Sequence, residues 1–476
     1  MELLRINLEQ YELPKFWYNI TADLPNKLAP ALDIHGNPAS LDDMAKIFPH
    51  TILEQEVATA RYVEIPEEVR RIYAQWRPIP LCRAHRLEEI LETPAKIYYK
   101  YEGMSAAGSH KPNSAIPQAY YNKLAGVKRL TTETGAGQWG ASISYAGQMF
   151  GLPVRVYMVR VSYDQKVFRR STMTAWGSEV IASPSELTKA GRDALAADKN
   201  CRGSLGLAIS EAVEDAINDP NTCYTLGSVM NHVCMHQTVM GLECKKQLAK
   251  IDEYPDIVIG ACGGGSSFSG IAFPFLGDKL YDEPKAKNLR CIAVEPTSCP
   301  SLTKGVFTYD FGDASGYTPL MKMYTLGHDF MPPGIHAGGL RYHGCSPIIA
   351  QLYNDKMIEA VAVPQLATFD AGVQFARAEG IIPAPESCHA IRVAIDEALK
   401  CKQSGEAKTI LFCLTGHGHF DMLSYERYFS GELENYDYPQ EAVQKSLEHL
   451  PKIEKEKYKK YKKYKKYKKI FSTRFC

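Results

Sequence analysis

Two features are missing from the sequence: long apolar runs and closely spaced cysteines. No segment of the 476 residues approaches the roughly 18 apolar residues that a membrane-spanning helix needs. The opening residues, MELLRINLEQYELPKFW, do not combine a basic start with an apolar stretch, so we expect no secretory signal. These absences predict a cytoplasmic protein with no membrane partner.

The thirteen cysteines are odd in number and widely scattered, and the nearest two lie eight positions apart. A disulfide framework or a zinc cluster shows a tighter pattern, so the spacing predicts free thiols in a reducing compartment. Two histidine pairs, His232 with His236 and His417 with His419, have no carboxylate or cysteine at a spacing that completes a metal site. We therefore expect no metal and assign these histidines to hydrogen bonding.

Positive and negative residues nearly balance over the whole chain, but one segment is strongly basic. The net charge is +1, which creates no global field that favours nucleic acid. Residues 451–476, however, carry twelve lysines and arginines against two glutamates, and tyrosines recur there at every third position. This repeat forms no stable apolar face on a helix of about 3.6 residues per turn. The sequence therefore predicts a disordered basic tail and no nucleic-acid partner.

From about residue 95 onward, short apolar strands alternate with amphipathic helices. The pattern predicts strands at 95–102, 127–135, 153–160, 255–265, 288–296 and 407–418, and helices at 113–126 and 138–151. Such alternation is typical of an open α/β fold with largely parallel sheets and helices on both faces. Ligands bind such sheets at the carboxyl ends of the strands, so the glycine-rich strand ends are candidate sites.

The segment GSHKPN, residues 108–113, falls between a predicted strand and a predicted helix. Lys111 would lie there at the mouth of the sheet, where burial or neighbouring charges can keep an amine unprotonated. Such an amine forms a Schiff base with a carbonyl cofactor. The alternative is a solvated surface lysine, which the segment by itself favours.

The segment ACGGGSSF, residues 261–268, directly follows a predicted strand. Three glycines let the backbone turn its N–H groups inward, and the following helix adds the positive end of its dipole. No Walker lysine and no GxGxxG spacing accompany the turn, so a small phosphate group fits better than a nucleotide. A purely structural turn is the alternative.

Two further strand ends carry polar groups. In TTETGAGQWG, residues 131–140, hydroxyl and backbone donors can bind a substrate carboxylate, and Glu133 beside them is a candidate acid or base. In CLTGHGHFD, residues 413–421, Thr415 presents a hydroxyl where the strand ends. A structural loop and a helix-capping threonine are the respective alternatives.

Taken together, these segments resemble the tryptophan synthase β chain. GSHKPN, ETGAGQWG, GGGSS, EGIIPAPES (residues 379–387) and CLTGHGHFD occur in that family's order, and the resemblance covers roughly residues 75–425. The long N-terminal region, RPIPLCRAHRLE and LGSVMNHVCMHQTVMG are similar to the divergent second subfamily of β-chain-like enzymes. The resemblance implies fold type II of the pyridoxal-phosphate (PLP) enzymes, with two open, mostly parallel sheets flanked by helices and an active site between two lobes.

The resemblance also implies a division of the chain. The implied parts are an N-terminal extension (1–80), an N-terminal α/β lobe with a mobile subdomain and the Schiff-base lysine (81–245), a C-terminal α/β lobe with the phosphate turn (246–435), and a C-terminal helix with the basic tail (436–476).

The implied reaction condenses L-serine with indole to give L-tryptophan and water. Lys111 would hold PLP and remove the Cα proton of serine, and Glu133 would protonate the departing hydroxyl and later accept the proton of the indole nitrogen. The implied substrate-carboxylate residues are Thr134, Gly135, Ala136, Gly137 and Gln138. The implied cofactor-binding residues are His110, Lys111, Asn113, Gly263, Gly264, Gly265, Ser266, Ser267, Glu386 and Thr415.

The chain departs from the main family at three places. Trp139 stands in place of a histidine, Ser267 in place of an asparagine, and residues 336–344, HAGGLRYHG, in place of a stretch with a substrate-side aspartate. The resemblance implies a homodimer. The third departure argues against docking of the usual tryptophan synthase α subunit, and it leaves open which residue handles the serine hydroxyl.

Two other functions stay open from the sequence. Another fold type II PLP enzyme, such as a serine or threonine dehydratase or a cysteine synthase, would share the lysine and the glycine turn. The glutamate in the ETGAGQ loop favours indole chemistry over these. A non-catalytic partner protein that binds polyanions through its tail is the second alternative, and the intact Lys111, Glu133 and three-glycine turn argue against it.

Overall fold

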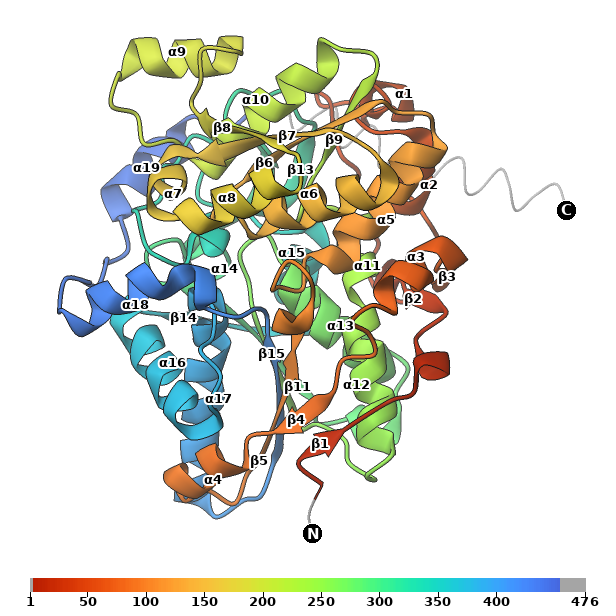
Figure 1. The fold of residues 1–476 in the computed structure, drawn as a ribbon, viewed down its shortest axis with the longest axis vertical. Coiled ribbons are helices and arrows are strands. Elements are labelled where there is room, and N and C mark those ends of the chain that lie inside the picture. The colour runs from red at the N-terminus through yellow and green to blue at the C-terminus, as the bar shows by residue number, and fades with distance from the viewer. Residues whose placement is uncertain (1–2, 454–476) are drawn as a thin grey trace, which may run out of the picture.

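The computed structural model describes residues 3–453, and within them two large sheets are joined by layers of helices (Figure 1). The larger sheet has seven strands in the order β1-β4-β5-β15-β10-β11-β14. Its strands are β1 (Arg5–Ile6), β4 (Leu81–Arg83), β5 (Lys96–Tyr101), β10 (Ile257–Ala261), β11 (Arg290–Pro296), β14 (Glu359–Val363) and β15 (Thr409–Leu414). β4 is antiparallel to β1 and β5, and the other pairs are parallel.

The smaller sheet is entirely parallel, in the order β8-β7-β6-β9. Its strands are β6 (Arg129–Thr134), β7 (Val154–Val159), β8 (Glu179–Ser183) and β9 (Thr222–Thr225). The six strands expected from the sequence are present as β5, β6, β7, β10, β11 and β15, and the two expected helices are α5 (Pro112–Leu124) and α6 (Gln138–Phe150). The expected α/β fold with largely parallel sheets is confirmed.

Alternating side chains of the larger sheet enter two different cores. Ile257 and Ile259 of β10 pack with helices α16 (Gln365–Glu379) and α17 (Pro385–Ser404). Val258, between them, packs on the opposite face with α12 (Val239–Ala249) and α13 (Ser266–Leu280). Figure 1 shows these two helix pairs on opposite sides of the sheet. Burial on both faces explains why these strands read as continuous apolar runs in the sequence.

Helices also cover the smaller sheet, and short elements complete the fold. The remaining α-helices are α1 (Leu41–Met44), α2 (His50–Glu56), α3 (Glu67–Tyr73), α4 (His85–Leu91), α7 (Arg160–Gln165), α8 (Val167–Ala175), α9 (Lys189–Ala197), α10 (Leu205–Ile217), α11 (Asn231–Gln237), α14 (Ser301–Lys304), α15 (Pro347–Asn354), α18 (Met422–Phe429) and α19 (Gln440–Glu448). Two small antiparallel sheets are formed by β2 (Phe16–Tyr18) with β3 (Tyr62–Glu64), and by β12 (Val306–Phe311) with β13 (Leu320–Thr325).

Chain order and sheet membership do not coincide. β1, β4 and β5 precede residue 245 but belong to the larger sheet. The other four strands of that sheet all follow that residue. The division into parts at 80, 245 and 435 therefore stays a prediction. The basic tail expected at 451–476 lies outside the described residues from 454 onward.

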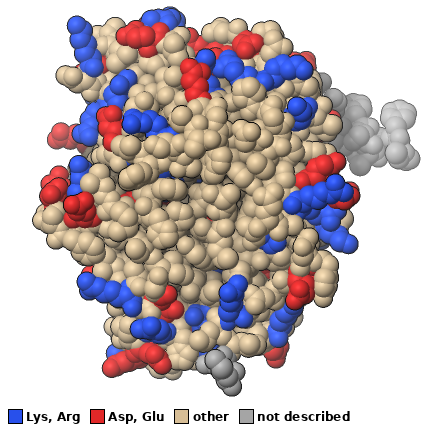
Figure 2. Space-filling view, viewed as in Figure 1, with Lys and Arg blue, Asp and Glu red and all other residues tan. Residues whose placement is uncertain are grey.

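The surface carries charges of both signs. In Figure 2, lysine and arginine side chains lie beside aspartate and glutamate side chains around the rim of the face, and its centre is uncharged. In the part of the chain that the structure describes, no helix has the length and apolar character needed to cross a membrane.

A fully buried ion cluster lies between the start of α5, where Asn113 bonds to Arg77 and Glu102, and Glu243 of α12. Arg77 contacts both oxygens of Glu102, at 2.6 and 2.5 Å, and Glu243 at 2.8 Å. The amine of Lys100 lies 2.7 Å from Glu243. Burial would raise the pKa of Glu243, but Arg77 and Lys100 hold it below its ordinary value. The two positive and two negative groups neutralise one another in the core, where none of the four side chains is exposed to solvent.

Replacement of Glu243 by Gln should destabilise the fold, because Arg77 and Lys100 would share one remaining counter-charge inside the core. We expect the free energy of unfolding to fall by about 3 kcal/mol, seen as a lower urea midpoint. The control is Glu67→Gln, which removes an exposed ion pair with Arg71 and should leave the midpoint unchanged. An equal effect of the two substitutions would contradict the role of burial.

Candidate active site

Two glycine turns at the ends of parallel strands form the frame of the site. One connects β10 to α13 and the other connects β6 to α6. The residues just before the helices, Gly265 and Gly137, have φ angles of 110° and 97°, a region that favours glycine. A Cβ at position 265 would also lie 2.2 Å from the Ile349 side chain. Each turn points the free N–H groups of a helix start at the edge where the strands end.

A polar cavity lies between these turns and the start of α5. It is lined by Gly108, Ser109, His110, Lys111, Gln138, Ser228, Ala261, Gly263, Gly264, Gly265, Ser266, Ser267, Gly339, Leu340, Ala384, Glu386, Thr415 and Gly416. The structure thus brings Lys111, the three-glycine turn and Thr415 around one space. Backbone hydrogen bonds join the contributing segments, from His110 N to Thr415 O at 2.8 Å and from Ala384 N to Gly416 O at 2.9 Å.

Lys111 stands directly before the first residue of α5, and its amine enters the polar cavity. It donates a hydrogen bond to the carbonyl of Gly227 at 3.1 Å. Desolvation lowers the pKa of Lys111 to about 8. The carboxylates of Glu133 and Glu386 favour the charged amine and so make this decrease smaller. A substantial share of this amine is therefore neutral near pH 8, and the neutral amine is the form that attacks a carbonyl carbon.

The departure at Trp139 is explained by packing behind Gly227. The Trp139 side chain is buried, and its indole nitrogen donates to Thr132 Oγ1 at 2.6 Å. A Cβ at position 227 would lie 2.6 Å from the Trp139 ring. The ring therefore packs against the residue whose carbonyl contacts Lys111.

One end of the polar cavity is suited to a phosphate group. His110 Nε2 and Ser266 Oγ lie 3.0 Å apart at the start of α13. Among the described residues, His110 Nδ1 and Ser267 Oγ are buried without a hydrogen-bond partner. Burial, then the charge of Lys111, lowers the pKa of His110 far enough to keep its ring neutral. Buried polar atoms without partners are costly, and phosphate oxygens beside the helix start would satisfy them. The residues present fit the phosphate of PLP.

Thr415 contributes a neutral hydroxyl to the lining of the polar cavity, and Ser387 lies beside it. The hydroxyl oxygens of Thr415 and Ser387 lie 2.7 Å apart. Glu386 Oε1 accepts a hydrogen bond from Gly339 N at 2.9 Å, while its Oε2 is buried without a partner in the described chain. Ser387 lies within the EGIIPAPES segment, but the sequence offered no reason to single it out.

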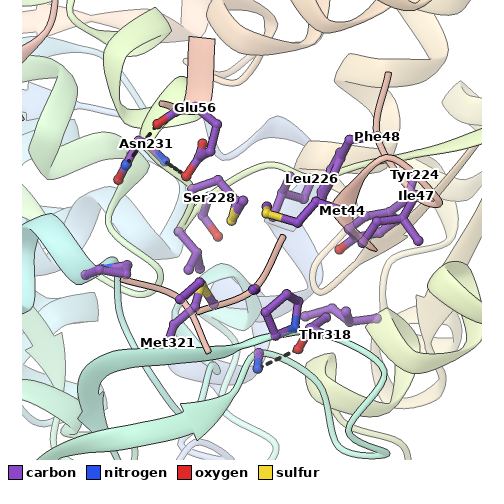
Figure 3. A pocket seen from close by; sticks show the side chains of 18 of the residues that line it. Met44, Ile47, Phe48, Glu56, Tyr224, Leu226, Ser228, Asn231, Thr318 and Met321 are labelled. Atoms are coloured by element: carbon purple, nitrogen blue, oxygen red, sulfur yellow. Dashed lines mark hydrogen bonds between the residues drawn. The ribbon is translucent and has the colours of Figure 1, made fainter. Parts of the chain in front are cut away.

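A second cavity, the apolar chamber, lies beside the polar cavity and measures about 410 Å³. Its apolar lining includes Leu28, Met44, Ile47, Phe48, Leu205, Ile209, Leu226, Val229, Met230 and Met321. Figure 3 shows Met44, Ile47 and Phe48 of the N-terminal region gathered with Leu226 and Tyr224. Ser228 lines both cavities, so the two spaces adjoin there.

Glu133 lines the apolar chamber rather than the polar cavity. Its Oε2 accepts a hydrogen bond of 2.5 Å from the hydroxyl of Tyr224. Burial raises the pKa of Glu133 to about 7, although Tyr224 and the charge of Lys111 pull it down. A carboxyl group with this pKa both donates and accepts protons near neutrality.

The loop expected to bind a carboxylate borders the polar cavity and a separate small cleft. Of its five residues, Gln138 lines the polar cavity, and Gly135 lines a small adjoining cleft with Gly338 and Arg341. The Thr134 hydroxyl accepts a hydrogen bond from Gly140 N at 3.1 Å, which fixes the oxygen and leaves its O–H to donate. The loop thus offers this hydroxyl and the backbone N–H groups at the start of α6 as donors for a carboxylate.

Arg341 is a residue that the sequence did not assign. Its side chain is buried, NH2 donates to Ser162 Oγ at 2.8 Å, and Nε has no partner among residues 3–453. Burial lowers the pKa of Arg341 to about 10. A Cβ at Gly338 would meet both Ala136 and the Arg341 guanidinium, at 2.9 and 3.1 Å. The divergent 336–344 segment therefore places a cation beside the carboxylate loop.

Asn113 does not line the polar cavity. Its side chain accepts a hydrogen bond from Arg77 Nε at 3.0 Å and donates to Glu102 at 3.0 Å and to Gln237 at 3.2 Å. It connects the start of α5 to the buried ion cluster. The resemblance implied a cofactor contact for Asn113, and that role stays a prediction, because the side-chain contacts in this structure are with Arg77, Glu102 and Gln237.

The histidine pairs take part in hydrogen bonds, as expected. His232 Nδ1 lies 2.7 Å from Glu56 Oε2, and His236 Nε2 lies 2.6 Å from Gln55 Oε1. His417 Nδ1 accepts from the backbone N–H of His419 at 3.1 Å. Within residues 3–453, no group of three side chains is arranged to hold a metal ion.

Known proteins resemble the chain over most of its length. The family model described as "Pyridoxal-phosphate dependent enzyme" matches residues 72–416. The tryptophan synthase beta chain 2 of Methanosarcina acetivorans is 59% identical over 434 residues, which cover 91% of this chain and 98% of the relative. The tryptophan synthase beta chain 2 of Thermotoga maritima is 58% identical over 421 residues, 88% of this chain and 99% of the relative.

Solved structures share the fold at low sequence identity. The fungal L-serine ammonia-lyase from Rhizomucor miehei superposes with a TM-score of 0.54 at 16% identity, covering 75% of this chain and 98% of that one. At this identity the likeness shows the fold alone.

Replacement of Lys111 by Ala should abolish covalent attachment of PLP, because no other lysine lines the polar cavity in the described chain. We expect the loaded wild type to show a visible absorption band and, after borohydride reduction, a modified peptide containing residue 111. Lys322→Ala, which removes a lysine from the apolar chamber instead, should keep both signals. A reduced adduct on Lys111→Ala protein would show that another amine holds the cofactor.

Proposed function

We propose residue roles from one premise: the chain belongs to the tryptophan synthase β-chain family of pyridoxal-phosphate-dependent enzymes. It is a PLP-dependent lyase of tryptophan biosynthesis, and it condenses L-serine with indole to give L-tryptophan and water. The observation that supports the roles below is the junction at Ser228. There the polar cavity with Lys111 meets the apolar chamber with Glu133.

The polar cavity supplies groups that suit each end of the cofactor. Gly263, Gly264, Gly265, Ser266 and Ser267, with His110, would bind the phosphate. Thr415, with Ser387 behind it, would present a neutral hydroxyl to the ring nitrogen, and Glu386 borders the same space. When bound, PLP supplies a conjugated ring that delocalises the electrons released at the Cα of the amino acid.

Lys111 would move the Cα proton of serine. Its pKa of about 8 means that the freed amine can accept a proton near neutral pH and release it again. The carboxylate of the amino acid would bind at the loop from Thr134 to Gln138, where the start of α6 and the nearby charge of Arg341 favour an anion. Asn113 supports this arrangement indirectly, because it joins the start of α5 to the buried ion cluster.

Glu133 would move the other two protons. As a carboxylic acid it can protonate the departing serine hydroxyl, and as a carboxylate it can accept the N–H proton of indole. Its pKa of about 7 allows both roles at one pH.

The apolar chamber suits indole, a flat apolar ring with one N–H group. Apolar side chains surround the space, and Glu133 provides a proton acceptor at its wall. A dehydratase or a cysteine synthase has no aromatic second substrate to place there, so the chamber favours tryptophan synthesis over these alternatives. The tail that a polyanion-binding partner would use lies outside the described residues, and nothing in the fold adds support to that alternative.

We also propose an oligomeric state, a partner preference and a location for the protein. A homodimer is proposed from the family, and the replaced 336–344 segment weighs against docking of a tryptophan synthase α subunit. A cytoplasmic location is supported by the twelve cysteines of the described chain, which are all unpaired.

Replacement of Glu133 by Gln should leave PLP binding intact and lower tryptophan formation by roughly a hundredfold or more, because an amide cannot exchange the two protons. In the wild type, kcat/KM for indole should fall as the pH drops through about 7, where Glu133 becomes protonated. The matched control is Glu295→Gln, which changes a buried glutamate of equally raised pKa outside both cavities. Turnover close to wild type in Glu133→Gln would remove the acid–base role.

Replacement of Met321 by Trp should fill part of the apolar chamber and obstruct indole. We expect KM for indole to rise roughly tenfold, while serine still changes the absorption spectrum and its conversion to pyruvate persists or increases. Met331→Trp, at a surface position outside the chamber, should behave like the wild type. An unchanged KM for indole would place the ring elsewhere.

A further inference from the structure

Tyr224 and Glu133 lie diagonally across two neighbouring parallel strands. Tyr224 of β9 pairs with Thr131 of β6, two positions before Glu133. Side chains at 131 and 133 point to the same face because strand side chains alternate. An aromatic side chain reaches its diagonal neighbour, and here the hydroxyl donates to Glu133 Oε2 at 2.5 Å.

We propose that Tyr224 is a positioning residue for the acid–base step. Its hydroxyl fixes one oxygen of Glu133 toward the wall of the chamber and leaves the other oxygen to exchange protons with the substrate. The inference rests on the proposed function, since it assumes that Glu133 exchanges these protons.

The N-terminal region holds Tyr224 in place. β9 is an edge strand of the smaller sheet, and the backbone N–H of Tyr224 donates to the carbonyl of Ile47 at 2.9 Å. The Phe48 ring packs on the tyrosine ring with centroids 5.7 Å apart. Tyr224 is only 2% exposed as a result. The segment that lines the chamber therefore also fixes the residue that orients Glu133.

The Tyr224 hydroxyl keeps its proton, and so remains a hydrogen-bond donor, near neutral pH. Burial, then the charge of Glu133, raises its pKa well above the ordinary value. A donor that keeps its proton stabilises the carboxylate form of Glu133 and opposes the effect of burial. Loss of the hydroxyl should therefore raise the pKa of Glu133.

Other charged or titratable groups face this pair from several elements. Lys111 at the start of α5 favours the carboxylate form of Glu133. Tyr342, from the 336–344 segment, is a neutral neighbour of the pair because burial raises its pKa well above the ordinary value. The negative charge of Asp313 also raises the pKa of Tyr224. Glu56 and Lys322 line the chamber farther along. None of these groups changes in a Tyr224→Phe variant, so an effect on the pH profile isolates the hydroxyl.

The experiment compares kcat/KM for indole against pH in PLP-loaded full-length wild type and Tyr224→Phe. We expect the midpoint of the acidic limb to move up by about one pH unit, and kcat near neutral pH to fall roughly tenfold. KM for serine and the visible absorption band should match the wild type, because the polar cavity is untouched.

Tyr157→Phe is the matched control. Tyr157 lies buried on β7, the neighbour of β6, and its hydroxyl donates to Asp215 at 3.2 Å outside both cavities. Its pH profile should equal that of the wild type. If Tyr224→Phe fails to load cofactor, Phe48→Leu, which keeps the hydroxyl but loosens the ring, should move the limb in the same direction by a smaller amount.

An acidic limb that stays in place in a loaded Tyr224→Phe enzyme, or in loaded Phe48→Leu if the first variant cannot be loaded, overturns the positioning role. The Glu133→Gln variant separates two kinds of failure. If that variant is inactive, only the inference on Tyr224 fails. If it keeps its turnover, the acid–base role of Glu133 fails, and the proposed function must be revised first.

Discussion

Burial of Lys111 and Glu133 on either side of the junction at Ser228 is the constraint on which the proposed chemistry depends. Burial disfavours whichever form of a group is charged, so it lowers the pKa of the Lys111 amine to about 8 and raises the pKa of the Glu133 carboxyl to about 7. The two groups attract each other, which limits both shifts. One physical effect thus brings the pKa values of an amine and a carboxyl group close to the same pH, as the proposed roles of Lys111 and Glu133 require.

The rest of the fold keeps this junction in shape. Backbone hydrogen bonds join the segments around residues 110, 384 and 415, although they are far apart in the chain. Behind Lys111, the Trp139 ring packs on Gly227 and the ion cluster of Arg77, Glu102, Lys100 and Glu243 anchors α5. Removal of one member of a buried ion cluster leaves an unpaired charge in the core, which is strongly destabilising. Because Asn113 of α5 bonds to Arg77 and Glu102, the position of Lys111 depends on this cluster.

Much of this architecture could be predicted from the sequence. The strands from β5 to β15 alternate with helices and end in glycine, and this periodicity reports burial on both faces of a sheet. Their position at strand ends made Lys111, Gly263 to Gly265 and Thr415 candidates, because ligands bind where parallel strands end, and the resemblance to the family then implied their roles. The hydrogen bonds of Asn113 to Arg77 and Gln237 could not be predicted, since these partners are distant from it in the chain. Ser387 and Arg341 were not assigned, because their importance arises from neighbours that are distant in the chain.

By itself, the sequence determined the class of fold, because apolar periodicity reports burial on a sheet. It also made Lys111, the three-glycine turn and Glu133 candidates, because each lies at a strand end, and the resemblance implied their roles. Only the tertiary structure decided that Glu133 faces an apolar chamber, that Tyr224 holds its carboxylate, and that residues 44–48 form a wall of that chamber. These facts depend on the packing of the N-terminal region against the edge of a distant sheet. Long-range packing of this kind leaves no period or motif in the chain, since it is specified by shape and burial rather than by spacing.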